Sequence, residues 1–122
     1  MLLGLRTVIY RAPDIAAGKL WYTKFLGFGP YFDQPFYVGF NIGGYELGLD
    51  PDPSGRSGAG GSVAYWRVDA IDEAVRHFVR AGATVTSAVQ DVGEGIKVAK
   101  VADPFGNIIG LLENPHFRLT VT

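Results

Sequence analysis

The sequence predicts an α+β fold made of two βαβββ modules in tandem. The 122 residues are enough for one domain with a sizeable core, and 48% of them are hydrophobic, as in a globular chain. The same order of elements, one strand, one helix and three strands, can be assigned on each side of a Gly-rich segment. One such module would leave an apolar sheet face bare, so we expect the two to pack together or to exchange partners. We therefore divide a single domain, 1–122, into module one (1–50), a linker (51–61) and module two (62–122).

Module one is expected to begin with a strand over 5–11, where β-branched and aromatic residues dominate. Asp14 can cap the helix that follows, and Gly27 marks the end of that helix. Gly43-Gly44 is a hairpin signal between two alternating segments. The expected elements are a helix over 15–26 and strands over 29–33, 36–42 and 45–49.

The linker and module two follow the same logic. Residues 50–61 contain two prolines, four glycines and two serines, which is typical of an exposed connection. In the turn Asp103–Asn107 the order Asp-Pro-x-Gly-Asn favours a tight reversal, and its polar side chains can bond to nearby backbone. The next helix has an apolar side made of Ile71, Ala74, Val75, Phe78 and Val79. The expected elements are a helix over 71–81 and strands over 63–68, 83–92 (broken near Ser87), 95–101 and 108–112.

Composition excludes several classes of function. The formal net charge is −1, from 11 basic and 12 acidic residues, so there is no electrostatic footprint for nucleic acid or an anionic membrane. The chain has no cysteine, which excludes disulfides, thiolate nucleophiles and cysteine-based metal sites. The apolar start is too short for a signal peptide, and no apolar run is long enough to span a membrane. We expect a cytoplasmic protein that binds neither nucleic acid nor membrane.

Three stretches, 5–28, 68–72 and 103–115, resemble the opening, the start of the second module and the closing hairpin of the vicinal-oxygen-chelate superfamily. They include Leu5-Arg-Thr-Val-Ile-Tyr-Arg-Ala-Pro-Asp-Ile15, Val68-Asp-Ala-Ile-Asp72 and Asp103-Pro-Phe-Gly-Asn107. That superfamily includes glyoxalase I, extradiol dioxygenases and bleomycin-resistance proteins. The resemblance covers essentially the whole chain. It implies curled mixed sheets around a cleft, and commonly a homodimer.

Enzymes of this superfamily hold a divalent metal with side chains on four strands that face the cleft. By the resemblance, these positions fall on Thr7, Glu46, Val63 (Ser62 or Ala64 after a one-residue slip) and Gly110. Only Glu46 is a good ligand, and one carboxylate is far from a set of three or four protein ligands. The two histidines do not complete it, since His77 is expected on the exposed side of its helix and His116 in the tail or a dimer contact. We expect no metal and no cofactor.

The predicted site is an apolar and aromatic cleft with a few polar groups. Because side chains alternate along a strand, Thr7 should share a face with Ile9 and Arg11, while Val8 and Tyr10 face the helix. Gly48 and Gly110 should leave room for a ligand, and the arginines favour a planar or anionic one. The candidate ligand-binding residues are Thr7, Ile9, Arg11, Glu46, Tyr65, Arg67 and Gly110.

These residues favour a metal-free protein that binds a small organic molecule. The alternative is a lyase, isomerase or dioxygenase of glyoxalase type, in which Glu46 is a metal ligand or, with a pKa raised by burial, a general base. A third possibility is an interaction module in which dimerisation matters more than the cleft. Two simpler roles also stay open: Glu46 can pair with Arg11 or Arg67, and Tyr65 can belong to the core.

Overall fold

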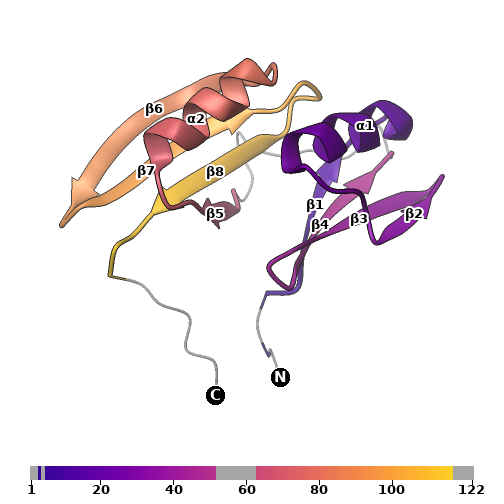
Figure 1. Cartoon of the computed structure of the whole chain (residues 1–122), viewed down its shortest axis with the longest axis horizontal. Coiled ribbons are helices and arrows are strands. Elements are labelled where there is room, and N and C mark those ends of the chain that lie inside the picture. The colour runs from indigo at the N-terminus through magenta and orange to yellow at the C-terminus, as the bar shows by residue number, and fades with distance from the viewer. Residues whose placement is uncertain (1–2, 4, 52–62, 117–122) are drawn as a thin grey trace. The chain divides into compact units, whose positions relative to one another are not determined.

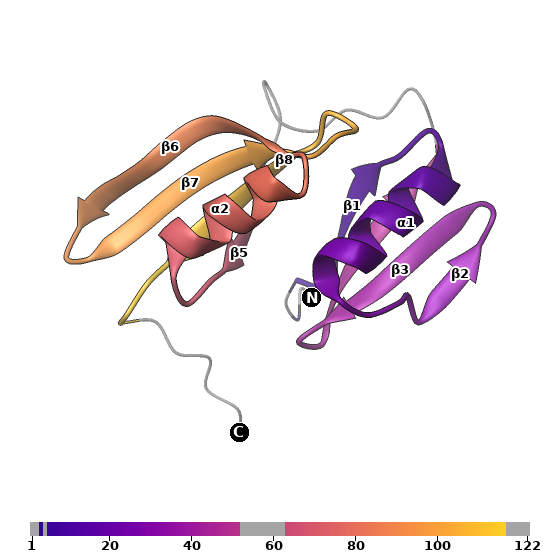
Figure 2. The ribbon, with the colours of Figure 1, turned by 45° about the horizontal axis from the view of Figure 1, so that its top comes forward.

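A computed structural model describes residue 3 and residues 5–51 and 63–116. Apart from Pro51, the predicted linker lies outside the described residues, as does the chain beyond His116. The chain forms two compact units, and the turn residues 105–107 belong with the first of them. Each unit has a four-stranded mixed sheet and one helix (Figures 1 and 2). This confirms the predicted α+β class and the two βαβββ modules; the expected cleft stays a prediction.

In the first unit the sheet order is β1-β4-β3-β2, with β1 parallel to β4 and the other neighbours antiparallel. The second strand begins later than predicted, at Phe32. Pro30 has no N–H to give to a strand partner, and the first sheet hydrogen bond comes from the N–H of Tyr31 to the carbonyl of Gly39, at 3.0 Å. The elements are β1 (Thr7–Arg11), α1 (Ile15–Leu26), β2 (Phe32–Gln34), β3 (Tyr37–Ile42) and β4 (Tyr45–Asp50).

The core of the first unit lies between α1 and one face of its sheet. Gly18 allows the helix to approach closely, because a Cβ there would lie 2.7 Å from the Cβ of Ala12. Alternation along β1 holds as expected: Ile9 is 52% exposed and Tyr10 only 2%. The side chains on the face turned away from α1 are therefore not part of this core and can bind other molecules. Buried side chains on the helix-facing side are Tyr10, Tyr22, Val38, Phe40, Leu47 and Leu49.

In the second unit the sheet order is β5-β8-β7-β6, again with one parallel pair, β5 and β8. The first strand is shorter than the predicted 63–68. The predicted break near Ser87 is confirmed, because the pairing with β7 shifts register on both sides of that residue. The elements are β5 (Tyr65–Arg67), α2 (Ile71–Arg80), β6 (Thr84–Gly93), β7 (Ile96–Ala102) and β8 (Ile108–Glu113).

The apolar side of α2 is narrower than predicted. Ile71 and Phe78 are buried, but Val79 is 48% exposed. Val79 lies about 80° around the helix axis from Ile71, at the rim of the apolar stripe and in the last turn. Neither helix among the described residues is long and apolar enough to cross a membrane.

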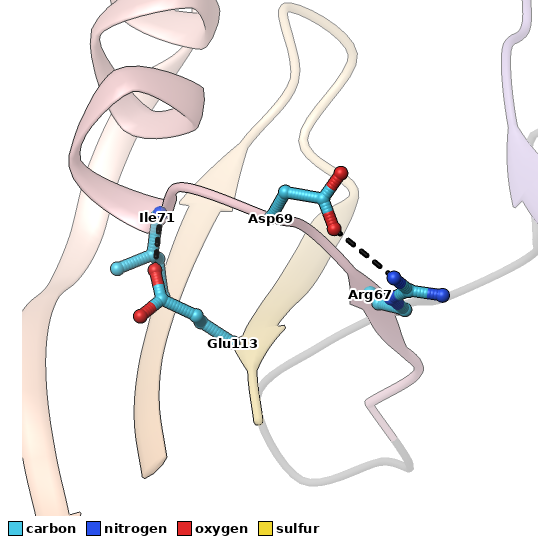
Figure 3. Close-up of polar contacts among 4 residues, drawn as sticks. All are labelled: Arg67, Asp69, Ile71 and Glu113. Carbon is cyan, nitrogen blue, oxygen red and sulfur yellow. Dashed lines mark hydrogen bonds and ion pairs between the residues drawn. The ribbon is translucent and has the colours of Figure 1, made fainter. Parts of the chain in front are cut away.

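The two helices begin differently. Asp14 caps α1 locally, accepting a hydrogen bond from the N–H of Ala17 at 3.1 Å. At α2 the capping position is Ala70, which has no side-chain oxygen. Instead, the N–H of Ile71 donates to Glu113 Oε1 at 2.9 Å, from the end of β8 (Figure 3). Glu113 therefore faces the helix, on the opposite side of the sheet from Gly110.

The Asp103–Asn107 turn is anchored far from its neighbours in sequence. The side chain of Asn107 is only 1% exposed. The N–H of Arg11 donates to Asn107 Oδ1 at 2.8 Å, and Asn107 Nδ2 donates to the Arg11 carbonyl at 2.6 Å. These two bonds join the turn to the end of β1.

Candidate functional site

A carboxylate surrounded by hydroxyl groups lies on the face of the first sheet that is turned away from α1. Glu46 on β4 is directly opposite Thr7 on β1. Thr7 Oγ1 donates to Glu46 Oε1 at 2.5 Å, and the hydroxyl of Tyr37 donates to the same oxygen at 2.6 Å. The hydroxyl of Tyr31 donates to Glu46 Oε2. We call these four residues the Glu46 cluster.

Two glycines make room for the Glu46 cluster. Gly39 and Gly48 are opposite each other on β3 and β4. A Cβ at Gly39 would lie 2.8 Å from Glu46 Oε2, so the carboxylate extends over that glycine. At Gly48, a Cβ would clash with the hydroxyl and ring of Tyr37. The space over Gly48 that we expected to be open to a ligand is thus filled by Tyr37.

The hydroxyl groups favour the ionised form of the Glu46 carboxyl group. Hydrogen bonds from Thr7, Tyr31 and Tyr37, in that order of importance, lower the pKa of Glu46 from its ordinary value of 4.5, and the charge of Arg6 adds to this. The pKa of Tyr31 is raised, mainly by its hydrogen bond to Glu46. The pKa of Tyr37 is raised first by burial and then by the same carboxylate. Near neutral pH the cluster is one carboxylate with neutral donors around it.

This arrangement corrects two expectations for Glu46. A general base would need a raised pKa, whereas the pKa of Glu46 is lowered and its proton affinity is reduced. A salt bridge with Arg11 is also replaced by the hydroxyl contacts, because among the described residues of the first unit Glu46 is in no ion pair. Arg67 pairs with Asp69 at 3.1 Å (Figure 3).

The other predicted residues of the first unit share the face of the Glu46 cluster. Ile9 pairs in register with Gly48, and Arg11 pairs with Asp50. Arg11 Nε is buried and has no hydrogen-bond partner among the described residues. Phe32 is opposite Gly39, so it lies on this face too, with its ring 6.1 Å from that of Tyr37. The face combines the Glu46 cluster with Arg11, Asp50 and exposed apolar and aromatic side chains.

In the second unit the equivalent position contains no acid. Glu46 and Gly110 each donate a backbone hydrogen bond at the start of a parallel strand pair, to Arg6 and Ala64 respectively, both at 2.9 Å. Gly110 is opposite Tyr65, whose ring covers it: a Cβ on Gly110 would lie 2.6 Å from Tyr65 Cδ1. Tyr65 is still 44% exposed and so is not a core residue. The room expected over Gly110 is occupied by this ring.

The donor groups do not fit a divalent metal. No three His, Cys, Asp or Glu side chains gather at one place in the described parts of the chain. Both oxygens of Glu46 already accept protein hydrogen bonds, and Val63 and Gly110 have no donor atoms in their side chains. The histidines lie elsewhere: His77 is exposed on α2, and His116 Nε2 is 2.8 Å from the carbonyl of Glu94.

Tyr31 and Tyr37 were missing from the predicted site. Tyr37 could have been found, because alternation along 37–42 puts it on the same face as Gly39 and Asn41, opposite β4. Tyr31 precedes β2, so no strand pattern marks its direction. Its contact with Glu46 depends on the reversal of the chain between α1 and β2.

The fold and the cluster define a protein of two βαβββ modules with a hydrogen-bonded acid, Glu46, on the face of the first sheet that is turned away from α1. The chain belongs to the Glyoxalase/Bleomycin resistance protein/Dioxygenase superfamily, whose family model matches residues 4–111. No curated protein sequence is similar enough to this chain to count as a match.

Solved structures agree with this membership. A glyoxalase-related enzyme from Fulvimarina pelagi is 21% identical, with a TM-score of 0.74 over 98% of this chain and 94% of that chain. Lactoylglutathione lyase from Agrobacterium tumefaciens is 21% identical, with a TM-score of 0.72 over 95% and 98%. TioX from Micromonospora sp. ML1 is 22% identical, with a TM-score of 0.70 over 90% and 98%. At these identities the likeness concerns the fold alone.

Proposed function

We propose that this chain is a metal-free protein that binds a small organic molecule on the face that carries the Glu46 cluster. The observation that carries the proposal is that Thr7, Tyr31 and Tyr37 hold the side chain of Glu46 as a hydrogen-bonded carboxylate. Binding sites for small molecules combine apolar and aromatic surface with a few placed polar groups. This face has that composition.

Exposure of the aromatic side chains supports the proposal. Tyr31, a member of the cluster, is 57% exposed, and Phe36, which precedes Tyr37 in the sequence, is 66% exposed. The ring of Phe32 lies 6.2 Å from that of Phe36. Exposed aromatic groups that adjoin a charged group are typical of recognition surfaces rather than of inert ones. In the proposed function the ligand covers these rings.

Calorimetric titration of chelator-free protein tests the proposal. The ligands are a panel of aromatic acids, aromatic amines and antibiotics, each titrated with and without EDTA, and metal content is measured in parallel. We expect at least one ligand to bind, with the same affinity in EDTA. A stoichiometric divalent ion in the purified protein, or no heat with any ligand of the panel, would overturn the proposal.

A glyoxalase-type lyase, isomerase or dioxygenase is the competing function. Among the solved structures of similar fold is one named as lactoylglutathione lyase. The lowered pKa of Glu46 counts against its use as a base. Turnover of a glutathione hemithioacetal or a catechol by wild-type protein, abolished by Glu46→Gln, would favour the enzyme over the binding protein.

We also propose that the chain acts as a homodimer in the cytoplasm, as expected from the sequence and its resemblance. Sedimentation equilibrium gives the mass of the assembly, and fractionation of the producing cells gives its compartment. A monomer at micromolar concentration, or the protein outside the cytoplasmic fraction, would contradict this part of the proposal.

A further inference from the structure

We propose that the ligand presents a cationic nitrogen group, such as an amidinium or a protonated amine on a flat aromatic body, to Oε2 of Glu46. This inference rests on the proposed function and names the chemical class of the ligand. It departs from the planar or anionic ligand expected from the sequence. The reason is that the charged group to which three hydroxyls on this face donate hydrogen bonds is the carboxylate of Glu46.

The first argument concerns the hydrogen-bonding capacity of the carboxylate. Two carboxylate oxygens can accept about four hydrogen bonds. Among the described residues, Oε1 accepts from two hydroxyls, those of Thr7 and Tyr37, whereas Oε2 accepts from Tyr31 alone. Oε2 is therefore the oxygen with an acceptor position left for an incoming donor.

The second argument concerns which of the two tyrosines can yield. Tyr37 belongs to β3, is half-buried and packs over Gly48. Tyr31 lies outside the strands and is 57% exposed, while its backbone is fixed by the hydrogen bond to Gly39. Rotation of the Tyr31 side chain would expose Oε2 without any change in the sheet. Exposed side chains change rotamer on the picosecond to nanosecond timescale.

The third argument concerns charge and aromatic rings around Oε2. An anionic ligand would be repelled by Glu46, whereas a cation would be attracted to it and to the faces of nearby rings. Phe32 and Tyr37 supply such rings, 6.1 Å apart. Arg6 is the cation that acts on Glu46, and its Nη1 donates to the carbonyl of Gly44 at 3.4 Å, on the exposed hairpin.

Arg11 lies further along the same face and does not change the expected sign. It pairs in register with Asp50, four positions along the strand from the Thr7–Glu46 pair. A ligand that spans both groups would place its cationic end at Glu46. The negative charge and the open acceptor position of Oε2 therefore favour a cationic group at this place, whatever group binds near Arg11.

Calorimetric titration with benzamidinium chloride and sodium benzoate tests the inference, because the two ions have nearly the same size and shape and opposite charge. We expect benzamidinium to bind wild-type protein at millimolar concentration, and benzoate to bind at least about tenfold more weakly. Glu46→Gln should weaken benzamidinium binding about tenfold or more. Glu73→Gln is the matched control, because it makes the same charge change at an exposed site on α2, and it should leave binding unchanged.

Tyr31→Phe gives an independent measurement at an exposed side chain. Without the hydroxyl, the ligand no longer competes for Oε2, so benzamidinium should bind a few-fold more tightly than to wild type. Unchanged or weaker binding in Tyr31→Phe overturns the inference, as does benzoate that binds as well as benzamidinium. This variant keeps the test decisive if Glu46→Gln fails to fold.

The inference and the proposed function can fail separately. If an aromatic acid from the panel binds and Glu46→Gln has no effect on it, the inference is overturned while the proposed function stands. If neither benzamidinium nor any ligand of the panel produces heat, both are overturned.

Discussion

The two modules use the same order of elements but treat the same strand position in opposite ways. In module one the position holds Glu46, which extends over Gly39 and collects three hydroxyl donors. In module two it holds Gly110, which is covered by the ring of Tyr65. One face is polar and charged at this point, and the other is apolar. The comparison teaches that a scaffold can keep its backbone pattern while the chemistry at one position changes completely.

The helix starts repeat this lesson. Module one caps α1 with a local residue, Asp14, and module two caps α2 with Glu113 from its last strand. Both solutions satisfy an N–H at a helix start. The first depends on four consecutive residues, and the second depends on the complete sheet. Substitutions that remove hydrogen bonds between neighbouring residues can therefore be compared with substitutions that remove bonds between residues far apart in the sequence.

The largest effect is expected at Asn107, whose amide supports β1 of module one from a distant turn. Asn107→Ala leaves a donor and an acceptor of the Arg11 backbone unpaired, which should lower the free energy of unfolding by about 3 kcal/mol. Urea unfolding measures it. Asn41→Ala is the control, because that amide is exposed and accepts one local bond from Gly44 at 2.9 Å; it should cost less than about 1 kcal/mol. Equal losses would contradict the account.

A methyl group added at each covered glycine comes next. In Gly110→Ala the new Cβ meets the base of the Tyr65 ring and the backbone oxygen of Ala64 at 2.8 Å, so we expect a loss of about 2–3 kcal/mol. In Gly48→Ala it meets only the far end of the Tyr37 side chain, so the strain is limited to a shift of that ring and of its hydrogen bond to Glu46, and about 1–2 kcal/mol is expected. Urea unfolding of the two variants compares them. A larger loss at Gly48 would reverse the difference between the modules.

Helix caps should give a smaller effect. Asp14→Ala and Glu113→Ala should each lower the free energy of unfolding by about 1 kcal/mol, because each removes one hydrogen bond at a helix start. Ala70→Ser would create a capping box with Glu73 and so give module two a local cap. It should recover most of the loss in the Glu113→Ala background, as measured by urea unfolding. No recovery would mean that Glu113 acts by some means other than capping α2.

The smallest expected effect is a change in pH dependence at the Glu46 cluster. The lowered pKa of Glu46 contributes stability that is present above its ordinary value of 4.5 and is lost as pH falls through the folded value. The raised pKa values of Tyr31 and Tyr37 contribute stability that is present below 10.0 and is lost as pH rises through their folded values. Glu46→Gln should flatten both edges of the stability profile.

Urea unfolding across the pH range measures this profile, with Glu73→Gln as the control of equal charge change. If Glu46→Gln gives the same profile as wild type, the hydroxyl groups do not stabilise the carboxylate. The polar contacts at Glu46 would then not distinguish module one from module two in stability.

The alternation of side chains along single strands was enough to predict on which face of its sheet a side chain lies. It correctly placed Thr7 and Ile9 on the face away from α1, and Glu113 on the face opposite Gly110. The partners of these side chains were harder to predict. Tyr31 lies before its strand, and Glu113 accepts its hydrogen bond from the backbone N–H of Ile71. Neither contact can therefore be predicted from the pattern of residue types.

The glycines also show where prediction stops. A glycine in a strand indicates that something approaches closely, but not whether it is a ligand or the chain itself. At Gly48 and Gly110 the approaching groups are the protein's own tyrosines. The charge state of Glu46 was likewise beyond the sequence, because it depends on three hydroxyls from different segments.

The hydrogen bonds of Asn107 have a consequence for the order in which the chain folds during synthesis. Its partner, Arg11, precedes it by 96 residues. During synthesis, β1 leaves the ribosome well before the amide that completes its end, because most of module two is made in between. Contacts between such distant residues form slowly. The first unit is therefore completed only after most of the second unit has been synthesised.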